Sequence, residues 1–136
     1  MTDNPFKPIF IDKIFLYGTL KSDGIFYQLF SKFVLKNEPA YTIGTLGVRK
    51  GYPTFYDKGS YKVFGELIHV YNIGQLLEFL EPQYNDKIKK IITVYTETAN
   101  EPIKAYCFVC AKPMDGVKII ESGYWDNKKA KIEELI

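Results

Sequence analysis

Three segments of this chain alternate between apolar and polar residues, and this pattern limits the fold more than any other feature. They run from Tyr61 to Tyr71, from Lys90 to Glu97 and from Ile103 to Ala111. A period of two puts successive side chains on opposite faces of a strand, so that one face can be buried. The polar residues 98–102 form a turn that pairs the last two strands. The sequence therefore predicts an α+β fold, a small mixed, mainly antiparallel β-barrel with a few short helices.

Shorter patterns predict the remaining elements. Apolar residues three or four positions apart are typical of a helix, and a short apolar run that stops at a glycine is typical of a buried strand. Asn72 has the side chain of an N-cap, and Pro82 ends the helix that follows at Glu81. The expected elements are a strand at Ile14 to Tyr17, helices at Ile25 to Phe33 and Ile73 to Leu80, a hairpin-like break at Asp57 to Ser60, and a charged terminal helix at Asn127 to Ile136.

The length and charge of the chain exclude several classes of protein. Its 136 residues suit a single domain, residues 1–136. The 18 basic and 16 acidic residues give a formal net charge of +2, so there is no reason to expect nucleic acid as a partner. No apolar run is long enough to span a bilayer, and the first residues lack the form of a signal peptide. We expect a cytoplasmic protein with no membrane partner.

The two cysteines share the spacing of redox and zinc motifs, in Cys107-Phe-Val-Cys110. This segment is predicted to be a strand, where residues three apart point to opposite faces. No second cysteine pair completes a metal site, and the one histidine, His69, lies in an alternating strand. We therefore predict two buried structural thiols, a half-exposed histidine and no metal.

Gly18 marks the first candidate site. It ends the apolar run Ile14 to Tyr17 and can take backbone angles closed to other residues, so the chain can turn sharply there. Such a turn leaves consecutive backbone N–H groups without strand partners. A row of free donors forms a concave anion site that suits a carboxylate.

Glu81 marks the second candidate site. On the predicted helix it adjoins Leu77 and Leu80, which face the core. A carboxylate at the rim of an apolar face loses solvation, which makes it a better proton acceptor near neutral pH. Glu78 and Glu66, by contrast, are expected to point into solvent.

Several short motifs occur in the order found in one enzyme family. Tyr17-Gly-Thr-Leu20 resembles the signature opening of the γ-glutamylcyclotransferase-like, or AIG2-like, family. The resemblance spans Lys13 to Trp125, and the joint order of the motifs carries it. The later motifs are Gly51-Tyr-Pro53, Val63-Phe-Gly-Glu-Leu67, Leu77-Glu-Phe-Leu-Glu81, Lys90-Ile-Ile-Thr-Val94, Ala105-Tyr106 and Ser122-Gly-Tyr-Trp125.

This resemblance implies an enzyme that cyclises a small-molecule γ-glutamyl substrate and releases 5-oxoproline with an amine or amino acid. Glu81 would be the catalytic proton shuttle. The backbone N–H groups of Gly18, Thr19 and Leu20 would hold the substrate carboxylate, and the hydroxyls of Tyr17 and Tyr106 would orient the amide. Because the attacking amine is tethered to the carbonyl, the reaction needs little beyond positioning. The resemblance implies no metal or organic cofactor.

The sequence also departs from the family pattern. Glu78 stands where Asp is usual, Pro82 where Gly follows the catalytic Glu, and Lys90 where Arg is common. The substrate's leaving group and the formation of a homodimer stay open. Two other functions stay open as well, a non-catalytic module that binds a small carboxylate and a different acyl-chemistry enzyme on the same fold.

Overall fold

Residues 10–81, 86–99 and 101–128, the part of the chain that this computed structural model describes, contain six strands, one α-helix and two 3-10 turns. In chain order these elements are β1 (Lys13–Leu16), η1 (Tyr27–Leu29), η2 (Ser31–Phe33), β2 (Val34–Arg49), β3 (Tyr52–Val70), α1 (Ile73–Leu80), β4 (Lys87–Thr96), β5 (Ile103–Cys110) and β6 (Lys118–Ile119). The charged terminal helix predicted at Asn127 to Ile136 lies almost entirely outside the described residues.

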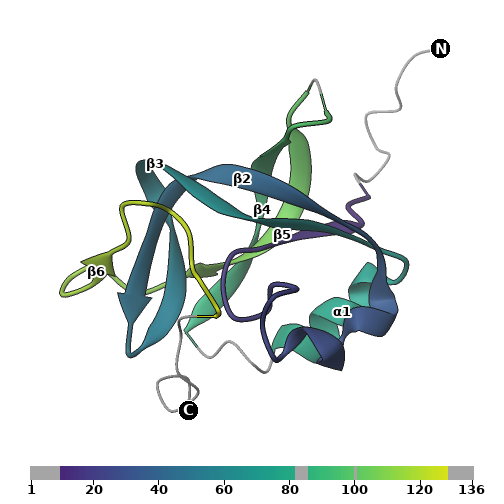
Figure 1. The fold of residues 1–136 in the computed structure, drawn as a ribbon, viewed down its shortest axis with the longest axis horizontal. Coiled ribbons are helices and arrows are strands. Elements are labelled where there is room, and N and C mark those ends of the chain that lie inside the picture. Colours follow the sequence, from purple (N-terminus) through teal and green to yellow (C-terminus); the bar gives the residue numbers. More distant parts are fainter. Residues whose placement is uncertain (1–9, 82–85, 100, 129–136) are drawn as a thin grey trace.

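Five of the strands close into a barrel (Figure 1). The order is β3-β1-β5-β4-β2, and the last strand, β2, pairs with the first, β3, which closes the barrel. The pairing of β1 with β5, at Ile14 opposite Tyr106, is parallel, while the other ladders are antiparallel. The short β6 adds to β2. The predicted mixed, mainly antiparallel barrel is confirmed.

The hairpin-like break predicted at Asp57 to Ser60 is wrong, because β2 and β3 form one long hairpin that turns elsewhere. The chain reverses at Lys50 and Gly51, both with positive φ, and β3 then continues without interruption to Val70. The expected break at Asp57 to Ser60 is instead a bulge within β3, where the register shifts between Gly44 and Thr45. The Thr45 hydroxyl donates to the Lys58 carbonyl at 2.7 Å, which holds the bulge in place.

The helix predicted at Ile25 to Phe33 is also wrong, because the chain forms the two 3-10 turns η1 and η2 there. Phe30 lies between them with φ −129°, which interrupts the helical backbone, and neither turn has a side-chain cap. A 3-10 turn places residues three apart on one side. This geometry buries Phe30 and Phe33 together against the barrel.

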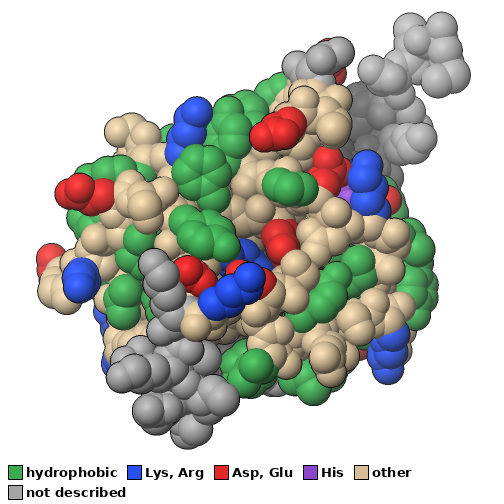
Figure 2. All heavy atoms as spheres, viewed as in Figure 1, with side chains coloured by type: hydrophobic (Ala, Val, Ile, Leu, Met, Phe, Trp, Pro, Cys, Tyr) green, Lys and Arg blue, Asp and Glu red, His purple; other side chains and the backbone are tan. Residues whose placement is uncertain are grey.

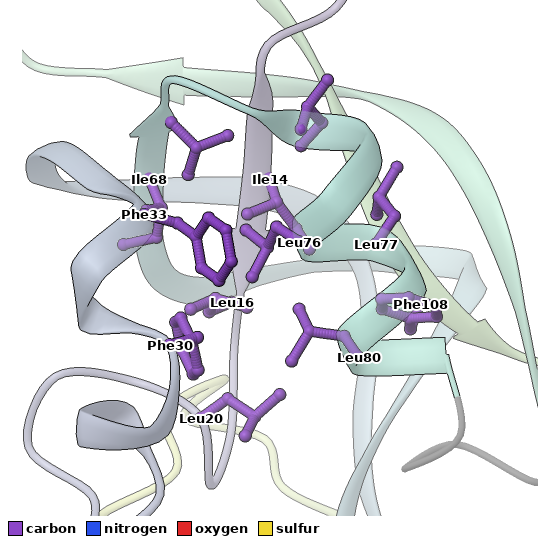
Figure 3. Close-up of a cluster of buried hydrophobic side chains, with 12 residues drawn as sticks. Ile14, Leu16, Leu20, Phe30, Phe33, Ile68, Leu76, Leu77, Leu80 and Phe108 are labelled. Carbon is purple, nitrogen blue, oxygen red and sulfur yellow. The ribbon is translucent and has the colours of Figure 1, made fainter.

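The helix predicted at Ile73 to Leu80 is confirmed as α1. Its N-cap is Asn72, whose side chain accepts a hydrogen bond from the Gln75 N–H at 3.2 Å. Its apolar face packs on the outside of the barrel and forms what we call the helix-side cluster (Figure 3). The members of this cluster are Ile14, Leu16, Leu20, Phe30, Phe33, Ile68, Val70, Ile73, Leu76, Leu77, Leu80 and Phe108. A second cluster, which includes Phe55 and Val94, fills the barrel interior.

The predictions for the cysteines and the histidine are confirmed. Cys107 and Cys110 are both buried and free, and burial raises the pKa of the Cys107 thiol well above its usual range. His69 is half-buried on β3, with its Nε2 2.7 Å from Oε2 of Glu38. The three side chains therefore have the burial that their positions on strands predicted.

The surface carries charges of both signs. Figure 2 shows basic and acidic side chains interspersed with hydrophobic ones on the face seen there. Within the described residues no helix is both long enough and apolar enough to cross a membrane.

Leu76 tests the importance of the helix-side cluster, because its side chain is completely buried there. We expect Leu76→Ala to lower the free energy of unfolding by about 2–5 kcal/mol, through lost burial and the cavity left behind. The matched control is Glu78→Ala on the exposed face of the same helix, which should change it by less than about 0.5 kcal/mol. Urea unfolding measures both. Equal effects of the two changes would contradict the assigned packing.

Candidate functional site

The loop that follows β1 forms the first half of the candidate site. Gly18, Thr19 and Leu20 lie just beyond the last strand residue and line a small cavity of about 20 Å³ together with Phe108. None of their backbone N–H groups donates a hydrogen bond to another described residue. The loop therefore presents the three consecutive donors that the sequence predicted.

Gly18 was predicted to adopt backbone angles closed to other residues, but the structure gives a different reason for a glycine at this position. Gly18 does not have a positive φ, unlike Gly51, Gly59, Gly116 and Gly123. A Cβ at Gly18 would instead lie 2.5 Å from Cγ of Pro53. Close approach of β3 to the loop, rather than unusual backbone angles, excludes a side chain here.

Two contacts with the C-terminal part of the chain fix this loop. The Gly18 carbonyl accepts from the Lys21 N–H at 3.1 Å and from Nδ2 of Asn127 at 3.0 Å. The Lys21 ammonium donates to the Trp125 carbonyl at 2.7 Å. Only 2% of Lys21 is exposed. The segment that carries the Ser122 to Trp125 motif thus supports the loop, together with Asn127.

The electrostatics around Lys21 follow from its burial. Burial lowers the pKa of its ammonium group, while Asp23, Glu66 and Asp126 oppose that shift. The ring of Tyr124 adds a cation–π contact, with its centroid 4.0 Å from Nζ.

Glu66 is not the purely solvated residue that the sequence suggested. Its side chain accepts from the Ser22 N–H at 2.7 Å and from Nδ2 of Asn37 at 3.3 Å. It also accepts from the Ser22 hydroxyl. The carboxylate of Glu66 therefore fixes the far end of the same loop to β2 and β3.

A larger cavity of about 530 Å³ adjoins the loop, within the usual range for a small-molecule pocket. It shares Thr19, Leu20 and Pro53 with the small cavity, so the two are contiguous. Its lining consists of Thr19, Leu20, Phe26, Leu29, Phe30, Arg49, Lys50, Tyr52, Pro53, Thr54, Phe79, Leu80, Asp86 and Lys87.

Glu81 lies at the C-cap of α1, directly after Leu80. Leu80 and Leu20 belong to one apolar cluster and line the same cavity (Figure 3), so the helix end and the loop meet. The Glu81 side chain itself is 50% exposed, with Oε1 3.2 Å from Nζ of Lys89. It is not among the residues that line either cavity. The expected desolvation of this carboxylate is therefore wrong for the unliganded protein.

The two tyrosines occupy different surroundings. Tyr17 is buried in the barrel interior and its hydroxyl donates to the Phe108 carbonyl at 2.9 Å. Tyr106 is half-buried at the edge of the helix-side cluster, with Nζ of Lys89 5.7 Å from its ring centroid. The predicted residues thus form two groups, the loop with Tyr17 and the pair of Glu81 and Tyr106 around Lys89.

Arg49, Asp86 and Lys87 were not singled out by the sequence, yet they line the larger cavity. Nε of Arg49 lies 3.4 Å from Oδ2 of Asp86, and Nζ of Lys87 lies 3.4 Å from Oδ1. Arg49 is distant in the sequence from Asp86 and Lys87 and meets them only in the folded barrel, so no local motif signals this group. Among the described residues no group of three or more His, Cys, Asp or Glu is placed to hold a metal ion.

The family described as "Gamma-glutamyl cyclotransferase, AIG2-like" matches residues 14–127. The chain belongs to this family. No curated protein matches it in sequence.

Several solved structures share the fold. YkqA from Bacillus subtilis has a TM-score of 0.68 and 22% identity over 84% of this chain and 39% of its own, so this chain spans well under half of that protein. An AIG2-like protein from Mus musculus has a TM-score of 0.67 and 20% identity over 82% of this chain and 87% of its own. A structure described as a γ-glutamyl cyclotransferase has a TM-score of 0.52 and 13% identity over 79% of this chain and 68% of its own.

Asp86 makes the stability of this family member depend on pH. Burial acts to raise its pKa, but Lys87 and Arg49 outweigh burial and lower the pKa below 3.8. The unfolded chain then binds more protons than the folded one, so the stabilisation is present above pH 3.8 and is lost as the pH falls through the lowered pKa. We expect Asp86→Asn to flatten the acid limb of a plot of unfolding free energy against pH.

The control for this experiment is Asp115→Asn, at an exposed position outside both cavities. Urea unfolding between about pH 5 and pH 2 covers the window in which the Asp86 carboxylate titrates. Identical acid limbs for the two variants would show that Asp86 is not held by the two cations.

Proposed function

We propose that this protein is a γ-glutamyl cyclotransferase-type enzyme that releases 5-oxoproline from a γ-glutamyl amine or peptide. The observation that carries the proposal is the row of backbone donors at Gly18, Thr19 and Leu20, set beside a cavity of about 530 Å³ that also receives the end of α1. Membership of the AIG2-like family supports the same reaction class.

In this reaction the α-amine of the γ-glutamyl group attacks its own γ-carbonyl carbon. A carbon–nitrogen bond forms to close the five-membered ring, and the bond to the leaving nitrogen breaks. The backbone donors at Gly18 to Leu20 hold the α-carboxylate and so orient the amine. Because nucleophile and carbonyl belong to one molecule, positioning supplies much of the rate.

Glu81 is the proton shuttle in this proposal. It accepts the proton that the α-ammonium must lose and returns one to the leaving nitrogen. In the unliganded protein its carboxylate pairs with Lys89 at 3.2 Å, at a half-exposed position. An exposed pair of this kind contributes about 0–1 kcal/mol, so substrate can displace Lys89 at little cost.

Tyr17 and Tyr106 have different roles in the proposed reaction. The Tyr17 hydroxyl already donates to the Phe108 carbonyl, so toward a substrate it can only accept, and its main contribution is to fix the loop against β5. Tyr106 lies near Lys89 and therefore on the same side as Glu81. We assign Tyr106 to orienting the substrate amide beside the shuttle.

One observation favours an alternative function, in which the protein binds a small carboxylate without turnover. The Glu81 side chain is paired with Lys89 and lines neither cavity. If that pair persists when a ligand is bound, the loop still binds the carboxylate but no group moves the proton.

Glu81→Gln separates these functions. The amide cannot accept a proton, so we expect 5-oxoproline formation to fall by at least about a hundredfold, the lower range for general acid–base catalysis. Binding of the γ-glutamyl compound should survive, because backbone donors hold its carboxylate. The measurement is 5-oxoproline release from a panel of γ-glutamyl amino acids and amines.

Glu78→Gln is the matched control, since Glu78 is an exposed residue on the same helix. It should keep the activity of the unmodified protein. A well-folded Glu81→Gln protein with near-full turnover would contradict the catalytic assignment. Binding without turnover by the unmodified protein would favour the binding module.

A further inference from the structure

We infer that Asn127 is a positioning residue for the carboxylate that the loop after β1 binds in the proposed function. Through the Gly18 carbonyl it holds and polarises the Thr19 N–H, and it couples this donor to the indole of Trp125. A carboxylate bound at Thr19 is therefore sensed by Trp125. The inference rests on the proposed function, because it concerns the donors that hold the substrate carboxylate.

The side-chain amide of Asn127 has a partner for each of its hydrogens and for its oxygen. Its Nδ2 donates to the Gly18 carbonyl at 3.0 Å and to Oδ1 of Asp23 at 2.8 Å. Its Oδ1 accepts from the indole Nε1–H of Trp125 at 3.0 Å. An indole N–H can only donate, while a carbonyl and a carboxylate can only accept, so these three partners fix the orientation of the amide.

Packing on both sides holds Asn127 against the loop. On one side, the ring of Trp125 packs against the cluster that fills the barrel interior. On the other side lies Gly24, where a Cβ would come within 3.1 Å of Nδ2 of Asn127 and 2.4 Å of the Thr19 carbonyl oxygen. The missing side chain at Gly24 therefore lets the Asn127 amide approach the loop closely.

The Gly18 carbonyl and the Thr19 N–H belong to one peptide group. The carbonyl accepts two hydrogen bonds, from the Lys21 N–H at 3.1 Å and from Nδ2 of Asn127 at 3.0 Å. The N–H at the other end of the group donates to no other described residue. Hydrogen bonds in a chain polarise one another, and more so at a buried position such as Gly18. The two bonds to the carbonyl therefore make the Thr19 N–H a stronger donor.

These groups form one chain of hydrogen bonds with a single direction. The indole N–H of Trp125 donates to the Asn127 amide, and that amide donates to Gly18. The Thr19 N–H of the same peptide group donates to the bound carboxylate. Each bond that an amide donates strengthens the one that it accepts, so a carboxylate at Thr19 also strengthens the bond of the indole. Replacing Asn127 breaks this chain in the middle.

The effect of Asn127 on binding is that of one neutral hydrogen bond, which changes an affinity by about twofold to tenfold. The α-carboxylate of the substrate does not react, so the loop holds it equally in the substrate and in the transition state. Loss of the Asn127 amide should therefore raise KM by that factor and leave kcat unchanged. Loss of the proton shuttle at Glu81, in contrast, lowers kcat.

The test uses the indole N–H signal in nuclear magnetic resonance spectra, which is unique because the chain has one tryptophan. In a titration of the unmodified protein with 5-oxoproline, the indole signal and the Thr19 amide signal should shift and saturate together.

Asn127→Ala should move the Thr19 amide signal of the unliganded protein, weaken 5-oxoproline binding by about twofold to tenfold and abolish the response of the indole. With a γ-glutamyl substrate, it should raise KM and keep kcat. The matched control is Asn72→Ala, which removes the amide that caps α1, outside both cavities. This control should leave the Thr19 signal, the affinity and the indole response unchanged.

The outcomes separate this inference from the proposed function. A saturating shift at Thr19 with an unmoved indole signal in the unmodified protein would overturn the inference, and this result decides even if Asn127→Ala does not fold. A lower kcat at unchanged KM in Asn127→Ala would also overturn it. If 5-oxoproline does not bind, the unliganded proteins decide, because an identical Thr19 signal with and without the Asn127 amide contradicts the polarisation. Binding of 5-oxoproline without turnover of γ-glutamyl compounds would remove the enzyme function and leave the role of Asn127 in place.

Discussion

The buried ammonium group of Lys21 holds together the part of the structure on which the site depends. It donates to the Trp125 carbonyl at 2.7 Å and is almost fully removed from water. Asn127 adds a contact to the Gly18 carbonyl at 3.0 Å. An ammonium group in this position is stable only because a carbonyl, a nearby aromatic ring and acidic side chains replace its hydration. The C-terminal segment thereby fixes the loop that lines the small cavity.

The helix-side cluster links stability to the chemistry of the site. Leu20 from the loop and Leu80 from the end of α1 belong to one buried cluster (Figure 3). Packing in a dense apolar core leaves little freedom to shift one element against another. The cluster therefore fixes the position of the C-terminal end of α1, and so of Glu81, relative to the loop, although the Glu81 side chain is half-exposed. The polar half of the cavity, with Arg49, Asp86 and Lys87, comes instead from the ends of β2 and β4.

Alternation within single segments was enough to predict β4, β5 and the second half of β3, because a period of two is a local property of the chain. The apolar run that ends at Gly18 was enough to predict a turn there. It could not show why a glycine is needed, since Pro53 approaches Gly18 only in the folded barrel. The ion pair of Glu81 with Lys89 and the cluster of Arg49, Asp86 and Lys87 depend on tertiary placement. The failed helix at Ile25 to Phe33 has a similar origin, because burial of Phe30 and Phe33 outweighed the helical pattern.

The central claim is that the loop from Gly18 to Leu20 binds a carboxylate through its backbone N–H groups. The most direct measurement is a titration of the isotopically labelled protein with 5-oxoproline, followed through the backbone amide signals in nuclear magnetic resonance spectra. 5-Oxoproline keeps the α-carboxylate of the γ-glutamyl group, so it should occupy the same donors. The account predicts that the amide signals of Gly18, Thr19 and Leu20 shift most and saturate together. Saturable shifts centred elsewhere, with these three signals unchanged, would contradict it.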